Sequence, residues 1–509
     1  MTTQNRVKTI GELRRSGYTV LPVKDEMRKN LIGKVKGGEK LFTGIVGFDK
    51  TVVPSLINAI LARHDIVLLG LRGQAKSRIV RLLPSLLDEY VPVIAGCEIN
   101  DNPYRPVCKR CVDLVKEQGD ETPIEWLHRD ARLGEKLATP DVTIADLIGD
   151  IDPIKAASQR LHFSHEGAIH FGIIPRTNRG IFAINELPDL QPRIQVGLLN
   201  ILEEKDIQIR GFNVRIPLDV MIVFTANPED YTNRGNIITP LKDRIDSQIL
   251  THYPRSLEDA IRITEQEAWV RRDGYRVIIP QYFREIIEQI AFEARASEFV
   301  DQKSGVSARM TIAAMENLVS NAERRALATG DTAVIPRICD LPHVLPGMTG
   351  KIELVFEGEQ EGAVKVGRAL IGKAVREVFK KYFPDPLQKK AKRGTEAAQR
   401  QAVDDGVYGQ VTKWFEAGNK TETADDMPLE TYFTALDKVS GLRELTLRHM
   451  KAAASSREEL AAAMEFTLEG LHQFSKVAKD ELEHRSSYKD MVGSIFTGGG
   501  KDDDYFERQ

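Results

Sequence analysis

Residues that could bind a phosphate group are concentrated in the segment "GLRGQAKSR", residues 70–78. Glycines allow backbone N–H groups to converge on an anion at the start of a helix, and a lysine adds a positive charge beside them. Lys76 is therefore predicted to reach the β- and γ-phosphates of a nucleotide, and Ser77 to hold Mg²⁺. The other predicted nucleotide contacts in this segment are Gly70, Gly73, Gln74, Ala75 and Arg78.

Ala75 stands where the general pattern of such a loop, G-x-x-x-x-G-K-[ST], has its second glycine. An alanine is tolerated there if its φ is negative, because its side chain is a single methyl group. The alternative interpretation is a glycine-bearing turn with a structural role only. The flanking segments favour a nucleotide site, because the loop follows the apolar run "DIVLLG" and precedes the helical pattern "RIVRLLPSLLDEY", in which Pro84 predicts a kink.

A carboxylate that could activate water follows the apolar segment "GIFAINEL". Strands of this kind in nucleotide hydrolases usually end in Asp-Glu, where the first residue supports the Mg²⁺ shell and the second polarises the attacking water. Glu186 is therefore the predicted water-activating residue. Asn185 is predicted to assist the metal through its amide oxygen, and because it is uncharged we expect a lower affinity for Mg²⁺. The alternative role for Asn185 is that of a helix N-cap.

Three further residues complete the set of candidate residues for a nucleotide-hydrolysing site. Asn227 ends the apolar segment "LDVMIVFTANPED" and is predicted to contact the γ-phosphate or to orient the water. Arg244 in "TPLKDRIDSQI" and Arg309 in "SGVSARMT" come after both nucleotide motifs. An arginine that reached a neighbouring subunit's nucleotide would stabilise transition-state charge and link hydrolysis to assembly. The alternative is that both arginines are solvated surface residues.

These residues require a scaffold that brings the ends of several apolar segments together. Four such segments, "DIVLLG", "VPVIAGCEI", "GIFAINEL" and "LDVMIVFTANPED", are separated by helical stretches, and each ends in polar residues. This order predicts an α/β fold with a parallel sheet and a ligand at the carboxyl ends of its strands. We predict four parts: an N-terminal extension (1–42), a nucleotide-binding domain with insertions (43–255), a helical lid (256–341) and a mostly helical C-terminal extension with a linker and a flexible tail (342–509).

Together these motifs resemble those of AAA+ ATPases, in the branch of magnesium chelatase I subunits and MoxR-type ATPases. The likeness covers about residues 43–330. The loop has the MoxR form G-x-x-G-x-A-K-[ST], and "IPRTNRGIFAINELPDL" is similar to the chelatase segment that leads into Walker B. "ITPLKDRID" matches the family's arginine-finger element, which contains Arg244, and "GVSARMT" matches the sensor 2 element, which contains Arg309.

The resemblance implies a P-loop core with a parallel sheet flanked by helices, a helical lid, and a homo-hexameric ring with ATP and Mg²⁺ between subunits. It implies an ATPase that remodels a partner protein, typically one with a von Willebrand factor A domain. Two alternatives remain open: a magnesium chelatase subunit that drives Mg²⁺ insertion into protoporphyrin, and a nucleotide-gated scaffold with little hydrolysis, which Asn185 favours. A sigma-54 activator is disfavoured, because no GAFTGA loop follows the phosphate loop.

Cysteine and histidine residues suggest a separate metal site. Cys97, Cys108 and Cys111 read C-x₁₀-C-x₂-C, and the last pair has the spacing of a zinc knuckle. These three cysteines are candidate ligands of a zinc ion, and His128 is a candidate fourth ligand. The alternative is a set of buried thiols in a reduced compartment. A structural role is favoured for three further histidines, His162, His165 and His170.

The composition argues against two classes of partner. The net charge of −3 gives no general attraction to nucleic acid, and Arg210 and Arg215 at a predicted hairpin tip are too few to change that expectation. No run of about 18 apolar residues is present, so no membrane span is expected. Residues 1–20 lack the apolar core of a signal peptide, which predicts a cytoplasmic protein.

Overall fold

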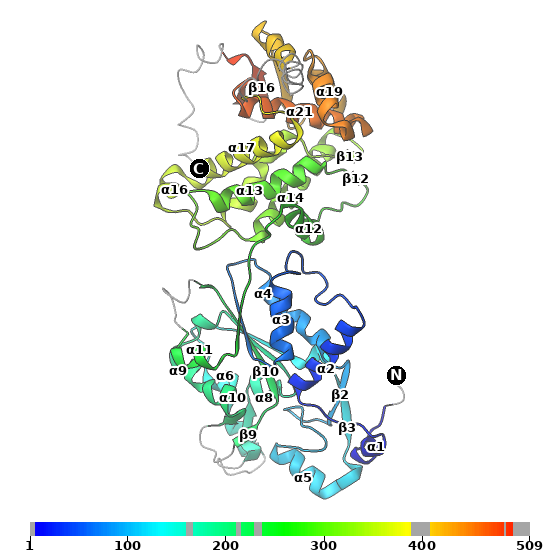
Figure 1. The fold of residues 1–509 in the computed structure, drawn as a ribbon, viewed down its shortest axis with the longest axis vertical. Coiled ribbons are helices and arrows are strands. Elements are labelled where there is room, and N and C mark those ends of the chain that lie inside the picture. Colours follow the sequence, from blue (N-terminus) through cyan, green and yellow to red (C-terminus); the bar gives the residue numbers. More distant parts are fainter. Residues whose placement is uncertain are drawn as a thin grey trace. The chain divides into compact units, whose positions relative to one another are not determined.

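The computed structural model describes residues 6–158, 166–209, 215–228, 237–387, 408–482 and 485–491. The chain forms two compact units, Met1–Tyr253 and Pro254–Gln509, called the N-terminal unit and the C-terminal unit below (Figure 1). Each unit has its own hydrophobic core. None of the helices among the described residues is long and apolar enough to cross a membrane.

A five-stranded parallel sheet forms the centre of the N-terminal unit. Neighbouring strands pair in parallel, with Leu69 opposite Ala226 and Phe224 opposite Ile184. The predicted α/β fold is therefore confirmed, and the carboxyl ends of the strands lie at one edge of the sheet. In spatial order the strands are β11 (Ser247–Leu250), β1 (Ile66–Leu69), β10 (Val220–Ala226), β7 (Gly180–Asn185) and β4 (Leu133–Leu137).

The segment "VPVIAGCEI" does not join this sheet, and its predicted place there is wrong. It forms β2 (Tyr90–Ile94), which pairs antiparallel with β3 (Ile124–His128). The sheet is completed instead by β4 and β11, whose sequences "LGEKL" and "SQIL" are short and partly polar. Both are edge strands with a neighbour on one side only, so they need fewer apolar side chains than the central strands.

Alternate residues of the central strands enter separate cores on the two faces of the sheet. In β1, Ile66 and Leu68 belong to one core and Val67 and Leu69 to the other. Because both faces are covered, the central strands are continuously apolar in sequence. The first core includes α2 (Val23–Lys36), α3 (Val52–Leu61) and α4 (Lys76–Leu82), and the second includes α9 (Pro192–Gly197), α10 (Leu199–Glu203) and α11 (Thr239–Arg244).

Part of the predicted N-terminal extension packs into the core of the N-terminal unit. Val23, Met27 and Leu31 of α2 are fully buried. Glu26 of the same helix forms a buried ion pair with Arg132, in which both N–O distances are 2.7 Å. Removing one partner of such a pair leaves an uncompensated buried charge, so the pair fixes α2 against the body of the unit.

The helix after the predicted phosphate loop changes type at its proline. α4 ends at Leu82, and Leu83–Leu86 continue as a 3₁₀-helix that contains Pro84. Proline lacks an N–H group and clashes with the preceding turn of an α-helix, so the tighter helix occupies the position of the predicted kink.

The insertions between the central strands add short elements. Two antiparallel pairs form, β5 (Gly149–Ile151) with β6 (Ile169–Phe171) and β8 (Asp206–Gln208) with β9 (Arg215–Pro217). The second pair is the predicted hairpin, and its tip lies outside the described residues. Further helices of this unit are α1 (Ile10–Arg15), α5 (Lys109–Gln118), α6 (Ile144–Leu147), α7 (Pro153–Ser158) and α8 (Ile173–Arg176).

The C-terminal unit is mostly helical, as predicted. Its core contains side chains from Tyr282 to Tyr488, so the predicted lid and the predicted C-terminal extension share one core. Its long helices are α12 (Leu257–Glu267), α13 (Gln281–Ala296), α14 (Ala308–Thr329), α17 (Ala363–Tyr382) and α21 (Arg457–Gln473), and shorter ones are α15 (Leu345–Thr349), α16 (Phe356–Glu361), α19 (Leu429–Asp437) and α20 (Leu442–His449).

A small antiparallel sheet in this unit was not expected from the sequence. Its strands lie in the order β14 (Thr421–Ala424), β16 (Arg485–Lys489) and β15 (Ala478–Leu482). Their sequences are short and polar, so the sheet depends on contacts with the helices. Tyr488 of β16, for example, is fully buried and donates a hydrogen bond to Glu469 of α21 at 3.0 Å.

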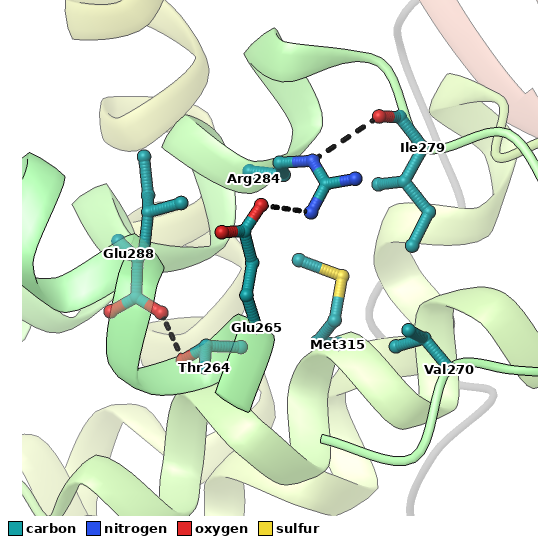
Figure 2. Close-up of a pocket in the computed structure, with 8 residues that line it drawn as sticks. Thr264, Glu265, Val270, Ile279, Arg284, Glu288 and Met315 are labelled. Atoms are coloured by element: carbon teal, nitrogen blue, oxygen red, sulfur yellow. Dashed lines mark hydrogen bonds and ion pairs between the residues drawn. The ribbon is translucent and has the colours of Figure 1, made fainter. Parts of the chain in front are cut away.

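A buried carboxyl group lies beside a small cavity in the C-terminal unit (Figure 2). Glu288 of α13 is 3% exposed and accepts a hydrogen bond from Thr264 of α12. The hydroxyl of Thr264 is in turn 3.1 Å from that of Thr311 of α14. Burial raises the pKa of Glu288 to about 7. The cavity is also lined by Ile261, Glu265, Val270, Ile279, Arg284 and Met315.

We expect Glu288 to make the stability of the C-terminal unit depend on pH. Its pKa in the folded state lies above the usual 4.5, so the folded state holds a proton that the unfolded chain releases. The resulting stabilisation, about 3 kcal/mol, is complete below the unfolded pKa and is lost as the pH rises through the folded pKa. Urea unfolding of the full chain from about pH 4 to about pH 8 should show this loss, and Glu288→Gln should remove it.

The matched control for this prediction is Glu298→Gln, which makes the same chemical change at an exposed position. It should leave the pH dependence of the unfolding free energy unchanged. A pH dependence in Glu288→Gln as steep as that of the wild type would contradict the assignment to Glu288.

Candidate functional site

The loop between β1 and α4 is folded onto itself by a buried glutamine. The Gln74 carboxamide oxygen accepts hydrogen bonds from the backbone N–H of Leu71 at 3.1 Å and from the Thr251 hydroxyl at 2.8 Å. A Cβ atom on Gly70 would overlap both side-chain oxygens, so only glycine fits that position. Gln74, predicted as a nucleotide contact, therefore uses its oxygen to shape the loop. Thr251, directly after β11, also holds the loop, and sequence reasoning missed it.

Ala75 does not have the negative φ that its tolerance was predicted to require. Its φ is +56°, in the left-handed region, and Gly73 two residues earlier has φ of +75°. A left-handed conformation costs a residue with a Cβ atom about 1–2 kcal/mol, a cost that glycine does not carry. The loop therefore holds Ala75 in a strained conformation that the surrounding contacts must maintain.

The side chain of Lys76 folds back over the loop. It is 7% exposed, and its ammonium group donates hydrogen bonds to the carbonyl oxygens of Gly70 and Leu71, the latter at 3.2 Å. It also donates to the Asn227 carboxamide oxygen at 2.7 Å. Lys76 thus joins the loop after β1 to the residue that follows β10.

Asn227 connects Lys76 to Glu186. Its carboxamide oxygen accepts from Lys76, and its NH₂ group donates to Glu186 Oε2 at 3.0 Å. The three residues follow β1, β10 and β7, which are adjacent in the sheet. The carboxyl ends of parallel strands are where open α/β sheets bind ligands. The structure therefore brings a cation, a carboxamide and a carboxylate together at that edge.

A buried threonine positions the end of β7. The Thr225 hydroxyl accepts from the backbone N–H of Glu186 at 3.1 Å and donates to the Asn185 carboxamide oxygen at 3.3 Å. Glu186, with φ of +56°, is itself the N-cap of the following 3₁₀-helix, so the alternative role of Asn185 as an N-cap is wrong. Sequence reasoning missed Thr225, although it lies two residues before Asn227 in the same polar strand end.

The predicted arginines are not among the residues that this series of hydrogen bonds joins. Arg244, the last residue of α11, forms an ion pair with Glu203 of α10 at 2.7 Å and donates to the Pro240 carbonyl oxygen at 3.0 Å. Arg309 is exposed in the first turn of α14 in the C-terminal unit. Ser77 is exposed and Arg78 partly exposed in the first turn of α4.

The three predicted cysteines do come together, with a different fourth residue. Cys97, Cys108 and Cys111 cluster with Asp101, whereas His128 contacts the ring of Tyr90 in the β2–β3 pair. His128 as a fourth ligand is therefore a wrong prediction. Hydrogen bonding from the Cys108 and Cys111 thiols lowers the pKa of Cys97 to about 3, and burial raises the pKa of Asp101 to about 6.

The other candidate residues belong to local structure. The ring of His170 in β6 lies 3.3 Å from the Arg176 guanidinium, and Arg215 in β9 lies 3.6 Å from Asp206. His162, His165 and Arg210 lie outside the described residues.

Part of the N-terminal unit matches a known protein family. Residues 162–249 match the family model described as the Sigma-54 interaction domain. The matched segment contains β7, β10 and α11. Residues 162–249 are thus similar to this domain.

Three solved structures show low similarity to the chain. NtrX from Brucella abortus is 12% identical, with 60% of this chain and 54% of that chain covered and a TM-score of 0.31. This chain thus spans about half the length of NtrX. A complex of the magnesium chelatase subunits BchI and BchD is 20% identical, with 63% of this chain and 98% of that chain covered and a TM-score of 0.33. A protein of Cytophaga hutchinsonii described as a candidate ATPase is 16% identical, with 71% of this chain and 97% of that chain covered and a TM-score of 0.28.

Proposed function

We propose that this protein is an ATP-hydrolysing AAA+ motor that assembles into a ring and remodels a partner protein. The active site would consist of Lys76, Asn227 and Glu186. The hydrogen-bonded series formed by these three side chains is the observation that carries the proposal. It links a cation suited to phosphate with a carboxylate suited to activating water, through a single carboxamide.

The residues around the loop fit a nucleoside triphosphate and Mg²⁺. Lys76 is held by carbonyl oxygens of its own loop, a position from which its ammonium group can pass to phosphate oxygens. Ser77 and Asn185 have side-chain oxygen atoms, which are the ligands that Mg²⁺ prefers. ATP would supply the bond that is cleaved, and Mg²⁺ would neutralise charge on its phosphates.

Glu186 would polarise the water that attacks the γ-phosphate. Its Oε2 is held by the Asn227 NH₂ group, so the direction of the carboxylate is set by the residue predicted to sense the γ-phosphate. If the Asn227 carboxamide turned toward a phosphate, it would release both Lys76 and Glu186. The series of hydrogen bonds thus offers a physical route by which nucleotide occupancy controls the position of the carboxylate.

The proposed assembly into a ring and the proposed partner protein rest on the sequence resemblance. Arg244 would act on the nucleotide of the neighbouring subunit in a homo-hexamer, and Arg309 would act from the lid. The partner would be a protein with a von Willebrand factor A domain. A magnesium chelatase subunit would use the same site, with Mg²⁺ insertion into protoporphyrin as the driven reaction.

The direct test measures phosphate release by the purified full-length protein in Mg²⁺-ATP across a range of protein concentrations. Turnover per subunit should rise with concentration and reach a plateau, because each site is completed by a neighbour. Binding of a fluorescent ATP analogue is measured in parallel. Absence of ATP binding would overturn the proposed site as a whole.

A nucleotide-gated scaffold is the second candidate, and the uncharged Asn185 favours it. In that case the protein binds ATP and assembles, and phosphate release stays at the level of a hydrolysis-deficient variant. The same two measurements therefore separate a motor from a scaffold.

The match to the Sigma-54 interaction domain favours a different partner for the motor, the sigma-54 factor. The sequence has no GAFTGA after its phosphate loop, which argues against this partner. Co-sedimentation of the ATP-bound ring with purified sigma-54 distinguishes the two partners, since only a sigma-54 activator should retain it.

Asn185→Asp is expected to raise the affinity of the ATPase for Mg²⁺. The new carboxylate adds a negative charge beside the metal and can still accept the hydrogen bond from Thr225. The Mg²⁺ concentration that gives half-maximal turnover should fall by about tenfold. Titration of turnover with Mg²⁺ measures this, and Asn200→Asp, which adds the same charge at an exposed position of α10, should leave it unchanged. An unchanged Mg²⁺ requirement in Asn185→Asp would remove Asn185 from the metal site.

A further inference from the structure

We propose that the N-terminal unit binds one structural Zn²⁺ ion, and that its ligands are Cys97, Asp101, Cys108 and Cys111. Their ligand atoms all lie within 4.8 Å of one another. Around a tetrahedral zinc ion, with Zn–S distances of about 2.3 Å, neighbouring sulfur atoms are about 3.8 Å apart. The cluster therefore needs only a small contraction to close on the metal.

The chemistry of the ligand set selects zinc. Thiolates are soft ligands that favour Zn²⁺ over Mg²⁺ or Ca²⁺, and three thiolates with one carboxylate complete a tetrahedron. A site with four protein ligands has no open position for water, which is typical of a structural site. The sulfur atoms of Cys97 and Cys108 are 4.0 Å apart, so these residues do not form a disulfide.

Asp101 gives an independent indication of a bound cation. Its side chain is fully buried, and its Oδ2 accepts a hydrogen bond from the Cys108 backbone N–H at 3.0 Å. Its Oδ1 is also buried and has no hydrogen-bond partner among the described residues. Leaving a buried carboxylate oxygen without a partner is costly, and a zinc ion would supply that partner. Idle buried thiols alone would not account for a carboxyl group buried beside them.

The backbone around the cluster favours the deprotonated sulfur atoms that zinc requires. The N–H of Asp101 points to the Cys97 sulfur at 3.3 Å, and the N–H of Cys111 points to the Cys108 sulfur at 3.4 Å. Such hydrogen bonds stabilise thiolate charge and orient the ligands before the metal binds. The second of these bonds arises because Cys108 is the N-cap of α5 and Cys111 lies in its first turn.

The position of the cluster indicates what the metal would do. Asn100, between two ligands, donates to the Arg176 carbonyl oxygen at 2.8 Å, and Asn178 donates back to the Ile99 carbonyl oxygen at 3.0 Å. The Asn178 carboxamide oxygen also accepts from the backbone N–H of Asp219, just before β10, at 2.9 Å. A metal that fixes this loop would brace the segments that enter β7 and β10, whose far ends carry Glu186 and Asn227.

The test is metal analysis of the full-length protein, purified under reducing conditions from zinc-containing medium. We expect elemental mass spectrometry to find about one zinc ion per chain. Replacement by Co²⁺ should give the absorption bands of tetrahedral thiolate coordination. Zinc removal by a chelator should lower the unfolding temperature, and zinc should restore it. These readouts do not depend on ATP hydrolysis, so they are independent of the proposed ATPase activity.

Variants test the ligand set itself. Cys97 is partly exposed, so Cys97→Ser should fold, and Asp101→Asn keeps the shape of the side chain while removing its charge. Each should weaken zinc binding by about tenfold or more, whereas Cys339→Ser, in the C-terminal unit, should not. Substoichiometric zinc in the folded wild type, iron in its place, or full zinc affinity in both ligand variants would each overturn the proposal.

Discussion

Replacing Glu186 with glutamine is expected to lower ATP turnover by about 100-fold or more and to leave ATP binding intact. A glutamine has nearly the same shape, and its carboxamide oxygen can still accept the hydrogen bond from Asn227. It carries no charge and cannot polarise water as a carboxylate does. Lys76 and the phosphate loop are unchanged, so the nucleotide should bind with wild-type affinity.

The measurement pairs phosphate release with binding of a fluorescent ATP analogue. Glu204→Gln makes the same change at an exposed position of the same unit and should leave both values unchanged. A Glu186→Gln variant with near-wild-type turnover would show that another group activates the water. Loss of binding together with turnover would instead mean that Glu186 supports the loop.

Arg244→Ala is expected to lower turnover by about 10³-fold without loss of ATP binding, as for an arginine that contacts a neighbour's nucleotide. In the single chain, Arg244 pairs with Glu203 and is not part of the hydrogen-bonded series formed by Lys76, Asn227 and Glu186. An arginine that contacts a neighbouring subunit's nucleotide would contribute to catalysis there and not to binding of its own subunit's nucleotide. Its loss should therefore affect the transition state and spare the ground state.

Mixing two inactive variants tests this action between subunits. An Arg244→Ala subunit retains Glu186, and a Glu186→Gln subunit can supply Arg244 to it. In randomly mixed rings with head-to-tail contacts, about a quarter of the sites should be complete, so turnover should recover to about that fraction of wild type. No recovery in rings shown to be mixed would overturn the role of Arg244 in a neighbouring site.

Glu203→Gln separates this role from a structural one. It removes the ion-pair partner of Arg244 but keeps the guanidinium group. Partly exposed ion pairs contribute little to stability, so turnover should stay within about threefold of wild type. A loss as large as that of Arg244→Ala would mean that the pair itself supports α10 and α11.

The sequence by itself determined the class of fold and pointed to the residues at the centre of the candidate site. Central strands of a sheet covered on both faces must be apolar throughout, so their ends are marked by polar residues. Glu186 and Asn227 were found as such ends, and Lys76 by its place between a strand and a helix. The structure joins these three residues at one edge of the sheet.

The tertiary structure alone decided which residues support them. Thr251 lies 177 residues from Gln74 in the sequence, yet their side chains hold the loop together. Thr225 of β10 likewise positions Asn185 and Glu186 at the end of β7. β2 pairs with β3 outside the parallel sheet, although its sequence is as apolar as that of the central strands. The periodicity of apolar residues in a segment indicates how buried that segment is. Its strand pairing and its side-chain hydrogen bonds depend on which distant segments pack against it. The local sequence of the segment does not show which segments these are.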